Sequence, residues 1–432
     1  MTFFFTIIFV LLVFWRPQDW LTPWLWGWNI LDGVFGAAVL SLLLEIDSGT
    51  IRFAPKYLVW VLFGLYFATV FSHVPHTYFG GVLLTWQETL KMCMFTLLLL
   101  CTLDRSQRLR TLMIVFVLMS SVMTVHALLQ HERGYGFGGQ RPIILQTREG
   151  VQIRSLFFGI FEDPNDLAQM ILLTVPLVFA IPRRLNFFTF LASSGVAYFL
   201  IKGVVATGSR GGVIGLSAMV ATLIGLKLKL KWLPYYLLFC VVMALVLCPF
   251  AGAALDSSAQ NRVIYWGMAN RVFKQNLFFG IGWGMFWQIA QGNPAHNAFV
   301  HCYTEIGTFG FAFWFGLIVL GILGCWRARL ALRPFIQKSD EGKYLYRVAG
   351  LSLVSMMGFC AAAYFLSRAF VYPFFFMIAH LNAITIVVER MIPMNQRPLL
   401  KRGWRMVALL GFGAIGSVIY IYISIILLNK AF

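Results

Sequence analysis

Residues 306–325 read IGTFGFAFWFGLIVLGILGC, twenty consecutive residues without a charged side chain. An α-helix rises about 1.5 Å per residue, so a run of this length can cross a hydrocarbon core of about 30 Å. Similar apolar runs recur along the chain, and we expect an all-α polytopic membrane protein with about 12–13 transmembrane helices. The predicted spans lie near 3–15, 28–45, 57–72, 79–101, 111–130, 165–181, 187–207, 212–226, 232–250, 298–325, 348–367, 372–388 and 406–428.

The composition excludes a soluble globular protein. Hydrophobic residues make up 60% of the chain and charged residues 12%, whereas soluble domains carry about 25% charged residues. The first apolar run, from Phe3 to Phe14, has no basic residue before it, which favours a membrane span over a signal peptide. The seven cysteines lie in or beside apolar segments and form no CxxC pair. We therefore expect small core residues and no disulfide or metal framework.

Basic residues alternate between the two sets of loops. The loops 46–56, 102–110, 182–186, 227–231, 326–347 and 389–405 carry 21 Lys and Arg residues. The positive-inside rule assigns this set, and with it the N-terminus, to the cytoplasm. The rule also accounts for most of the net charge of +18, which in a soluble protein would suggest nucleic acid. A thirteenth span would place the C-terminus on the opposite side.

The cations of the other set of loops are nearly all arginine, although positive charge resists translocation. A planar guanidinium offers two parallel donors and suits forked recognition of phosphate. The alternative is that these arginines pair with lipid phosphates or with the acids Glu132, Glu149 and Asp256. The cations of this set are Arg16, Arg133, Arg141, Arg148, Arg154, Arg210, Arg262, Arg271, Lys274, Arg368 and Lys430.

The segment 161–168, FEDPNDLA, predicts the start of a helix. Asp163 is a favourable N-cap and Pro164 a favourable first helical residue. One interpretation is that this segment is a helix cap and nothing more. The other is that Asn165 or Asp166 lines a polar, substrate-binding pocket at the membrane surface.

The segment 207–212, TGSRGG, joins two apolar spans. Its glycines permit a sharp reversal and a close approach of the two helices. Arg210 is thereby held at the membrane boundary, where an arginine is costly without a partner. It either extends toward water or binds an anion, and the constrained turn favours the anion site.

The segment that begins at Asn261 predicts a helix on which Arg262 and Trp266 share a face, one turn apart. Arg271 follows two and a half turns after Arg262 and points the opposite way. We therefore expect Arg262 to face a pocket, with Trp266 stacking on a sugar ring. The alternative is an interfacial helix with aromatic anchors.

Asn293 and Pro294 resemble an N-cap and a first helical residue, which would put His296 in the opening turn. Free N–H groups at such an end attract phosphate oxygens, and the dipole keeps imidazole neutral and able to accept a proton. A purely structural capping role is the alternative. His301 and Glu305, further along the helix, are predicted packing or interhelical contacts.

Together these motifs resemble the bacterial O-antigen ligase and polymerase family, over roughly residues 155–390. Residues 14–20, FWRPQDW, are also similar to a motif of the exosortase-associated O-glycosylation ligase branch. The residues that match the family pattern are Ser209, Arg210, Gly211, Arg262, Trp266, His296, Asn297, Glu305 and Gly307.

The resemblance implies a metal-independent, inverting glycosyltransferase of the C-type membrane (GT-C) fold, with no cofactor. It would transfer a glycan from undecaprenyl pyrophosphate to lipid A core, a protein or another polymer, at the periplasmic face of the bacterial inner membrane. By the same resemblance, Arg210 and Arg262 would hold the donor pyrophosphate, and His296 would act at the acceptor beside Asn297. The implied organisation is an N-terminal transmembrane region 1–154, a catalytic region 155–390 with a periplasmic loop 251–297, and a C-terminal region 391–432.

Two other functions are compatible with parts of this pattern. A polymerase of the same superfamily would use the same donor with a lipid-linked repeat as acceptor. A transporter or flippase of polyprenyl-linked sugars predicts mid-membrane charges and inverted repeats. Glu88, Lys91 and Lys202 are the candidate intramembrane charges, and no repeat is apparent.

Overall fold

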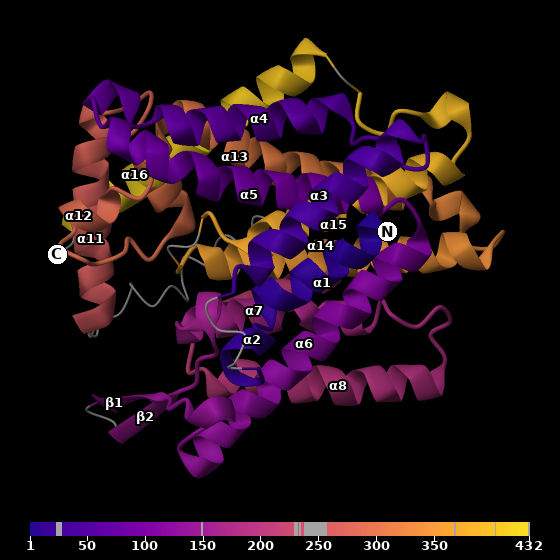
Figure 1. Ribbon diagram of the computed structural model, residues 1–432, viewed down its shortest axis with the longest axis horizontal. Helices are drawn as coiled ribbons and strands as arrows, with labels where there is room; N and C mark the ends of the chain where they lie inside the picture. Colours follow the sequence, from indigo (N-terminus) through magenta and orange to yellow (C-terminus); the bar gives the residue numbers. More distant parts are fainter. Residues whose placement is uncertain are drawn as a thin grey trace.

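The computed structural model describes residues 1–22, 28–147, 150–228, 232, 235–236, 257–366, 369–401 and 403–430. The predicted span 232–250 lies almost wholly outside these residues, as do Arg148, Glu149, Asp256 and Arg368. The described chain is a bundle of helices with one small hairpin (Figure 1), which confirms an all-α membrane fold.

Twelve described helices follow the predicted spans closely. Eight of them are long and apolar enough to cross a membrane, and α1 and α9 are shorter apolar helices. The twelve are α1 (Thr2–Phe14), α3 (Ile30–Asp47), α4 (Lys56–Phe71), α5 (Phe79–Thr102), α6 (Ser106–Arg133), α7 (Pro164–Val178), α8 (Phe187–Ala206), α9 (Arg210–Gly225), α13 (Ala298–Ala331), α14 (Asp340–Ala363), α15 (Tyr372–Met391) and α16 (Trp404–Lys430).

The two sets of loops gather at opposite ends of the bundle. At one end, which we call the basic end, Arg390 Nη1 lies 3.4 Å from Asp104 Oδ2, and Arg184 Nη2 lies 2.5 Å from Asp340 Oδ2. The other end, which we call the loop end, joins the segments 131–164, 206–210 and 276–297. There the Ser155 N–H donates to the Ala206 carbonyl at 3.2 Å. These contacts between distant segments agree with the predicted alternation of loops.

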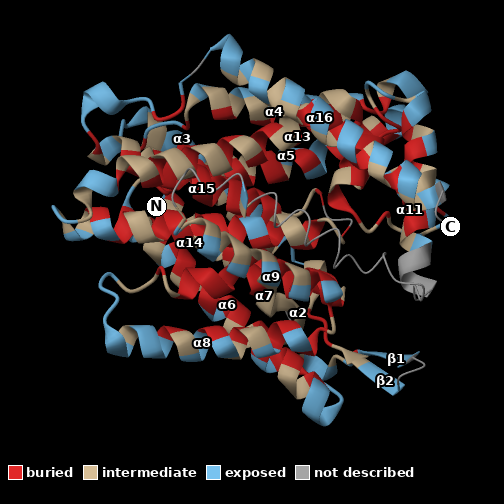
Figure 2. Ribbon diagram, turned by 180° about the vertical axis from the view of Figure 1, so that it is seen from behind, coloured by how far each residue is buried: buried red, intermediate tan, exposed pale blue. Residues whose placement is uncertain are grey.

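The core lies in the middle of the bundle, where α7 and α15 are buried over nearly their whole length. Figure 2 shows these helices beside α13 and α14, whereas α8 lies at the periphery and exposes much of its apolar surface. Exposed apolar side chains on the outer helices are expected where lipid replaces water as the solvent.

Short elements cover the loop end. Helix α11 (Ser257–Gln275) lies crosswise to the spanning helices (Figure 1), and α12 (Phe286–Ile289) follows it. Helix α2 (Pro17–Trp20) folds back after α1, and the Trp20 ring stacks on Phe137 with centroids 4.9 Å apart. Strands β1 (Ile143–Thr147) and β2 (Gly150–Arg154) form an antiparallel hairpin that the sequence analysis did not predict.

Helix α13 contains a kink at Gly307, whose φ of 65° and ψ of −176° are open only to glycine. Residues on both sides of the kink form hydrogen bonds with the segment that follows α11. The Thr308 N–H donates to the Leu277 carbonyl at 2.9 Å, and the Gly282 N–H donates to the Glu305 carbonyl at 3.0 Å. The first turns of α13 are thereby joined to the loop that follows α11.

Candidate active site at the loop end

The turn between α8 and α9 has the predicted sharp reversal. Gly208 has a left-handed φ of 61°, and Ser209 is the N-cap of α9, with its hydroxyl oxygen accepting from the Gly212 N–H at 3.2 Å. Arg210 is the first residue of α9 and is exposed at the loop end. The capped turn holds its backbone at the beginning of the helix, as expected.

The start of α7 is also as predicted, with Asp163 as N-cap and Pro164 as first residue. Asp163 Oδ1 accepts from the backbone N–H and the side-chain amide of Asn165, at 2.7 and 2.9 Å. Asn165 Oδ1 in turn accepts from Ser209 Oγ at 2.8 Å, so α7 and the turn before α9 are joined. Asn165 and Asp166 are buried, at 8% and 6% exposed, and their predicted contact with substrate remains a prediction.

Arg154, at the end of β2, belongs to the same network. Its Nη2 donates to Asn165 Oδ1 at 3.0 Å and its Nε donates to the Thr207 carbonyl at 3.4 Å. Burial lowers the pKa of Arg154, the Asp163 carboxylate opposes this, and the Arg210 charge lowers the pKa again. Arg154, Asp163 and Arg210 therefore interact electrostatically, although from the sequence only Arg210 was expected to bind substrate and Asp163 was expected to be an N-cap.

His296 does not lie in the opening turn of a helix. The prediction that α13 begins at Pro294 is wrong, because Asn297 is the N-cap and Ala298 the first residue. His296 precedes the cap with a left-handed φ of 51°, which is rare outside glycine and marks a position held by its surroundings. Trp266 Nε1 supplies one restraint by donating to the Ala295 carbonyl at 2.6 Å.

The imidazole of His296 is neutral at physiological pH, as predicted, but for different reasons. Burial lowers its pKa to about 4, the Arg262 charge contributes in the same direction, Asp163 opposes it and Arg154 lowers it again. The main causes are therefore desolvation and a neighbouring guanidinium, and the predicted effect of a helix dipole is not needed.

Five charged or titratable side chains at the loop end are thus linked by electrostatic influence, and we call them the loop-end cluster. They come from β2, the start of α7, the start of α9, α11 and the residue before the α13 cap. With a neutral imidazole the cluster has three positive charges and one negative charge, which favours an anionic ligand. Its members are Arg154, Asp163, Arg210, Arg262 and His296.

Trp266 lies on the predicted helix, but its side chain is buried where the prediction expected it to be open to a sugar. It lies on α11 one turn after Arg262, as expected, but its side chain is 1% exposed and packs edge-on against Tyr364 at 6.0 Å. A ring this deeply buried has no free face for a sugar. The expected stacking role is therefore replaced by a positioning role toward the His296 segment. Arg271 is exposed, and it follows Arg262 by two and a half turns, on the opposite side of α11.

Three further polar residues of α13 have protein partners. Asn297 is fully buried, and its Oδ1 accepts from the backbone N–H groups of Phe299 and Val300 at 3.0 and 3.1 Å. This capping role accounts for its position, and a contact with substrate remains a prediction. His301 Nε2 lies 3.2 Å from Glu305 Oε2, and Glu305 Oε1 accepts from the Phe286 N–H, so the predicted packing contacts are confirmed.

A separate cavity of about 270 Å³ lies between α1, α3 and α5, and no member of the loop-end cluster lines it. Arg16, Asp32, Glu88 and Lys91 supply its charged groups, and Lys91 Nζ lies 2.9 Å from Asp32 Oδ1. Within the described ranges, no three His, Cys, Asp or Glu side chains converge as metal ligands would.

Residues 195–315 match the O-antigen ligase family. This stretch is an O-antigen ligase domain. The match lies within the predicted region 155–390 and confirms the family resemblance for this stretch, which supports a membrane enzyme of the O-antigen ligase and polymerase type. The domain contains Arg210, Arg262 and His296, whereas Arg154 and Asp163 precede it in sequence. The chain has no significant match among curated proteins.

Proposed function

We propose that the protein is an inverting glycosyltransferase that moves a glycan from undecaprenyl pyrophosphate to an acceptor hydroxyl at the periplasmic face of the bacterial inner membrane. The observation that carries this proposal is the loop-end cluster, in which the charges of Arg262 and Arg154 act on a neutral imidazole and the charge of Arg210 acts on Arg154. The excess of Lys and Arg at the basic end supports the assignment of the loop end to the periplasm.

The arginines would bind the donor through its pyrophosphate. Arg210 and Arg262 supply fork-shaped donors for phosphate oxygens, and Arg154 adds a third positive charge fixed by Asn165. Charge on the leaving group increases as the glycosidic C–O bond breaks. Fixed cations at that position stabilise the transition state more than the ground state, which is the electrostatic role that accelerates the reaction.

His296 would accept the proton of the acceptor hydroxyl. The hydroxyl oxygen attacks the anomeric carbon, the bond to the pyrophosphate oxygen breaks, and the bonding pair leaves with undecaprenyl pyrophosphate. A histidine with a pKa of about 4 is neutral but weakly basic. The negative charge of a bound pyrophosphate would raise this pKa, so donor binding would make His296 a stronger base.

The polymerase and transporter alternatives differ in what they require. A polymerase would use the same cluster and differ only in the acceptor. A transporter would need charged groups that line a mid-membrane path. Lys91 pairs with Asp32 beside Glu88 in the cavity between α1, α3 and α5, and Lys202 lies 5.3 Å from the centroid of the Tyr198 ring. The enzyme is favoured over a transporter by the family match of residues 195–315.

The test is incubation of the purified full-length protein with undecaprenyl pyrophosphate glycan and candidate acceptors, with and without a chelator. Transfer with release of undecaprenyl pyrophosphate would support the proposal, and retained activity with chelator would support metal independence. Single additions to lipid A core or a protein indicate a ligase, whereas a ladder of lengthening products indicates a polymerase. Movement of the donor across vesicles without any transfer would contradict the enzymatic assignment.

A further inference from the structure

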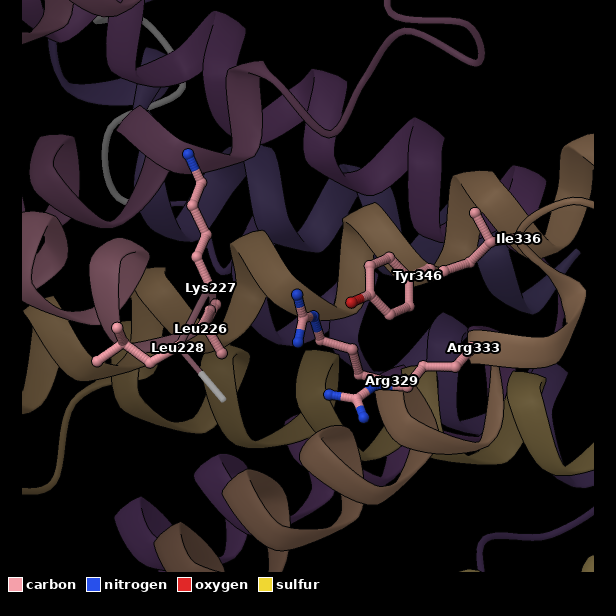
Figure 3. Close-up of a pocket in the computed structure, with 7 residues that line it drawn as sticks. All are labelled: Leu226, Lys227, Leu228, Arg329, Arg333, Ile336 and Tyr346. Atoms are coloured by element: carbon pink, nitrogen blue, oxygen red, sulfur yellow. The ribbon is translucent and has the colours of Figure 1, made fainter. Parts of the chain in front are cut away.

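A second set of cations lies at the basic end, at the opposite end of the bundle from the loop-end cluster. A cavity of about 670 Å³ opens there between the end of α9, the end of α13 and α14. Its positive groups are Lys227 after α9, Arg329 in the last turn of α13 and Arg333 just beyond it. Figure 3 shows the two guanidinium groups near each other and near the ring of Tyr346.

The positive charges of this cavity are not balanced by acids in its wall. Arg329 and Arg333 are four residues apart and repel each other, an arrangement that destabilises a helix end. No carboxylate is among the described residues that line the cavity. The nearby acids Asp340 and Glu341 pair instead with arginines of the 182–186 loop.

Arg329 is a buried cation with unused donors. Its side chain is 8% exposed, and in the part of the chain that the structure describes neither Nε nor Nη1 has a hydrogen-bond partner. Its guanidinium carbon lies 4.3 Å from the centroid of the Tyr346 ring, so one face of the group is covered. Buried charged donors are costly unless an acceptor satisfies them, and the side chain of Arg329 is one of those that line the cavity.

The carbonyl end of α13 is the simplest alternative partner for Arg329, because cations stabilise the last turn of a helix. That effect accounts for one cation and requires no cavity. The helix-end effect does not explain why Arg333 lies four residues after Arg329, at a spacing where the two charges repel. It also does not explain why Nε and Nη1 of Arg329 have no acceptor among the described residues. A ligand with several acceptor oxygens and negative charge explains both.

We propose that Arg329 and Arg333, with Lys227 at the rim, form a phosphate-binding site at the basic end, which takes a phospholipid headgroup or free phosphate. Two guanidinium groups can surround a phosphate and satisfy the buried donors of Arg329. Leu226, Leu228 and Ile336 line the same cavity and provide apolar surface suited to the glycerol and first methylene groups of a lipid. Basic pockets between helices on the cytoplasmic side commonly bind anionic lipids.

The experiment measures phosphate and lipid binding by the full-length protein in neutral detergent, using thermal stability and native mass spectrometry. Phosphatidylglycerol, phosphatidylcholine and inorganic phosphate are titrated separately. The wild type is expected to bind phosphatidylglycerol more tightly than phosphatidylcholine, or to be stabilised by inorganic phosphate. The first result identifies a lipid headgroup as the source of the phosphate, and the second identifies free phosphate.

Arg333→Gln is the main variant because this exposed residue can change without disturbing the fold. It should weaken binding of the effective probe by about fivefold or more, the contribution of one cation near an anionic surface. Arg329→Gln should weaken it further. Lys338→Gln is the matched control, because it removes an exposed charge at the same end but does not line the cavity. Equal binding of the effective probe by Arg333→Gln and Lys338→Gln would overturn the proposal. It would also be overturned if the wild type responded neither to inorganic phosphate nor more strongly to phosphatidylglycerol than to phosphatidylcholine.

Discussion

Trp266 Nε1 donates a hydrogen bond to the Ala295 carbonyl oxygen at 2.6 Å. This bond connects α11, which carries Arg262, to the residue directly before His296. Arg262 and the imidazole of His296 are therefore positioned by a shared contact, although they lie 34 positions apart in the sequence.

Trp266→Phe tests this connection, because phenylalanine keeps most of the buried ring and removes the N–H donor. We expect transfer to fall about fivefold, the effect of losing a hydrogen bond with a net contribution of about 1 kcal/mol. Steady-state kinetics should show the loss in kcat with little change in donor KM. Trp287→Phe, at a position 58% exposed on α12, is the control and should behave as wild type. Equal kinetics for both variants would remove the positioning role.

Arg262→Ala and Arg210→Ala should each reduce kcat/KM by about 100- to 1,000-fold, the usual effect of removing one group that stabilises transition-state charge. Arg271→Ala is the matched control, because this residue is exposed on the opposite side of the same helix. Purified protein yield should stay unchanged in all three variants. Full activity of both cluster variants would refute the role of the arginines in donor binding.

The pH dependence follows from the pKa of His296, which is about 4 in the free protein. A general base must be unprotonated, so kcat/KM should decrease as the pH falls through about 4. The profile of kcat should shift to a pH at least about one unit higher, because bound pyrophosphate favours imidazolium. His296→Gln should lose both inflections, and identical inflections in that variant would assign them to another group.

Asp163→Asn removes the one negative charge of the cluster while keeping an effective N-cap for α7. The cluster then has a larger positive charge, so donor KM should fall. The pKa of His296 should also fall, because Asp163 is the group that raises it, and kcat should decrease with the weaker base. Asp163→Ala also removes the cap and should destabilise the protein by about 1 kcal/mol. A donor KM that rises in Asp163→Asn would contradict the proposed charge balance.

Gly307→Ala tests the kink in α13. Alanine would need a φ of 65° and would bring its Cβ into the carbonyl group of Phe278. We expect a loss of at least about 1–3 kcal/mol, visible as a lower midpoint of thermal unfolding. Gly316→Ala, on the same helix, meets its nearest neighbour only at 3.9 Å and should be tolerated. Equal stability of the two variants would show that the kink is not required.

The helices could be predicted from the sequence because hydrocarbon imposes a strong, local requirement on composition. The predicted helix ends differ from the observed ones where a helix continues past its apolar run. Helix α6 begins at Ser106, five residues before the predicted start at 111, because its first turn includes polar residues outside the membrane core. The hairpin was missed, since a two-stranded element of ten residues has too weak a local signal.

The site was predicted in part. Arg210 was chosen from its glycine-rich turn, Arg262 from the helix face it shares with Trp266, and His296 from a helix start, and their roles toward a substrate stay predictions. Arg154 was only one of many outer arginines, and its place in the cluster depends on strand pairing and on distant contacts with Asn165 and Thr207. The start of α13 was misplaced because both Asn293 and Asn297 are good caps. A long-range hydrogen bond from Trp266 holds the segment between them outside the helix.

Helix α11 is held from outside the O-antigen ligase domain, by α16. Asn429 Nδ2 donates to the Val263 carbonyl at 3.2 Å, and Asn270 Nδ2 donates to the Tyr422 carbonyl at 3.1 Å. A chimera with residues 195–315 of this protein in a distant relative would pack α11 against the last helix of that relative, which need not offer the same hydrogen bonds. The graft would also lack Arg154 and Asp163. Successful grafts between such enzymes must therefore exchange three separated stretches of the gene together.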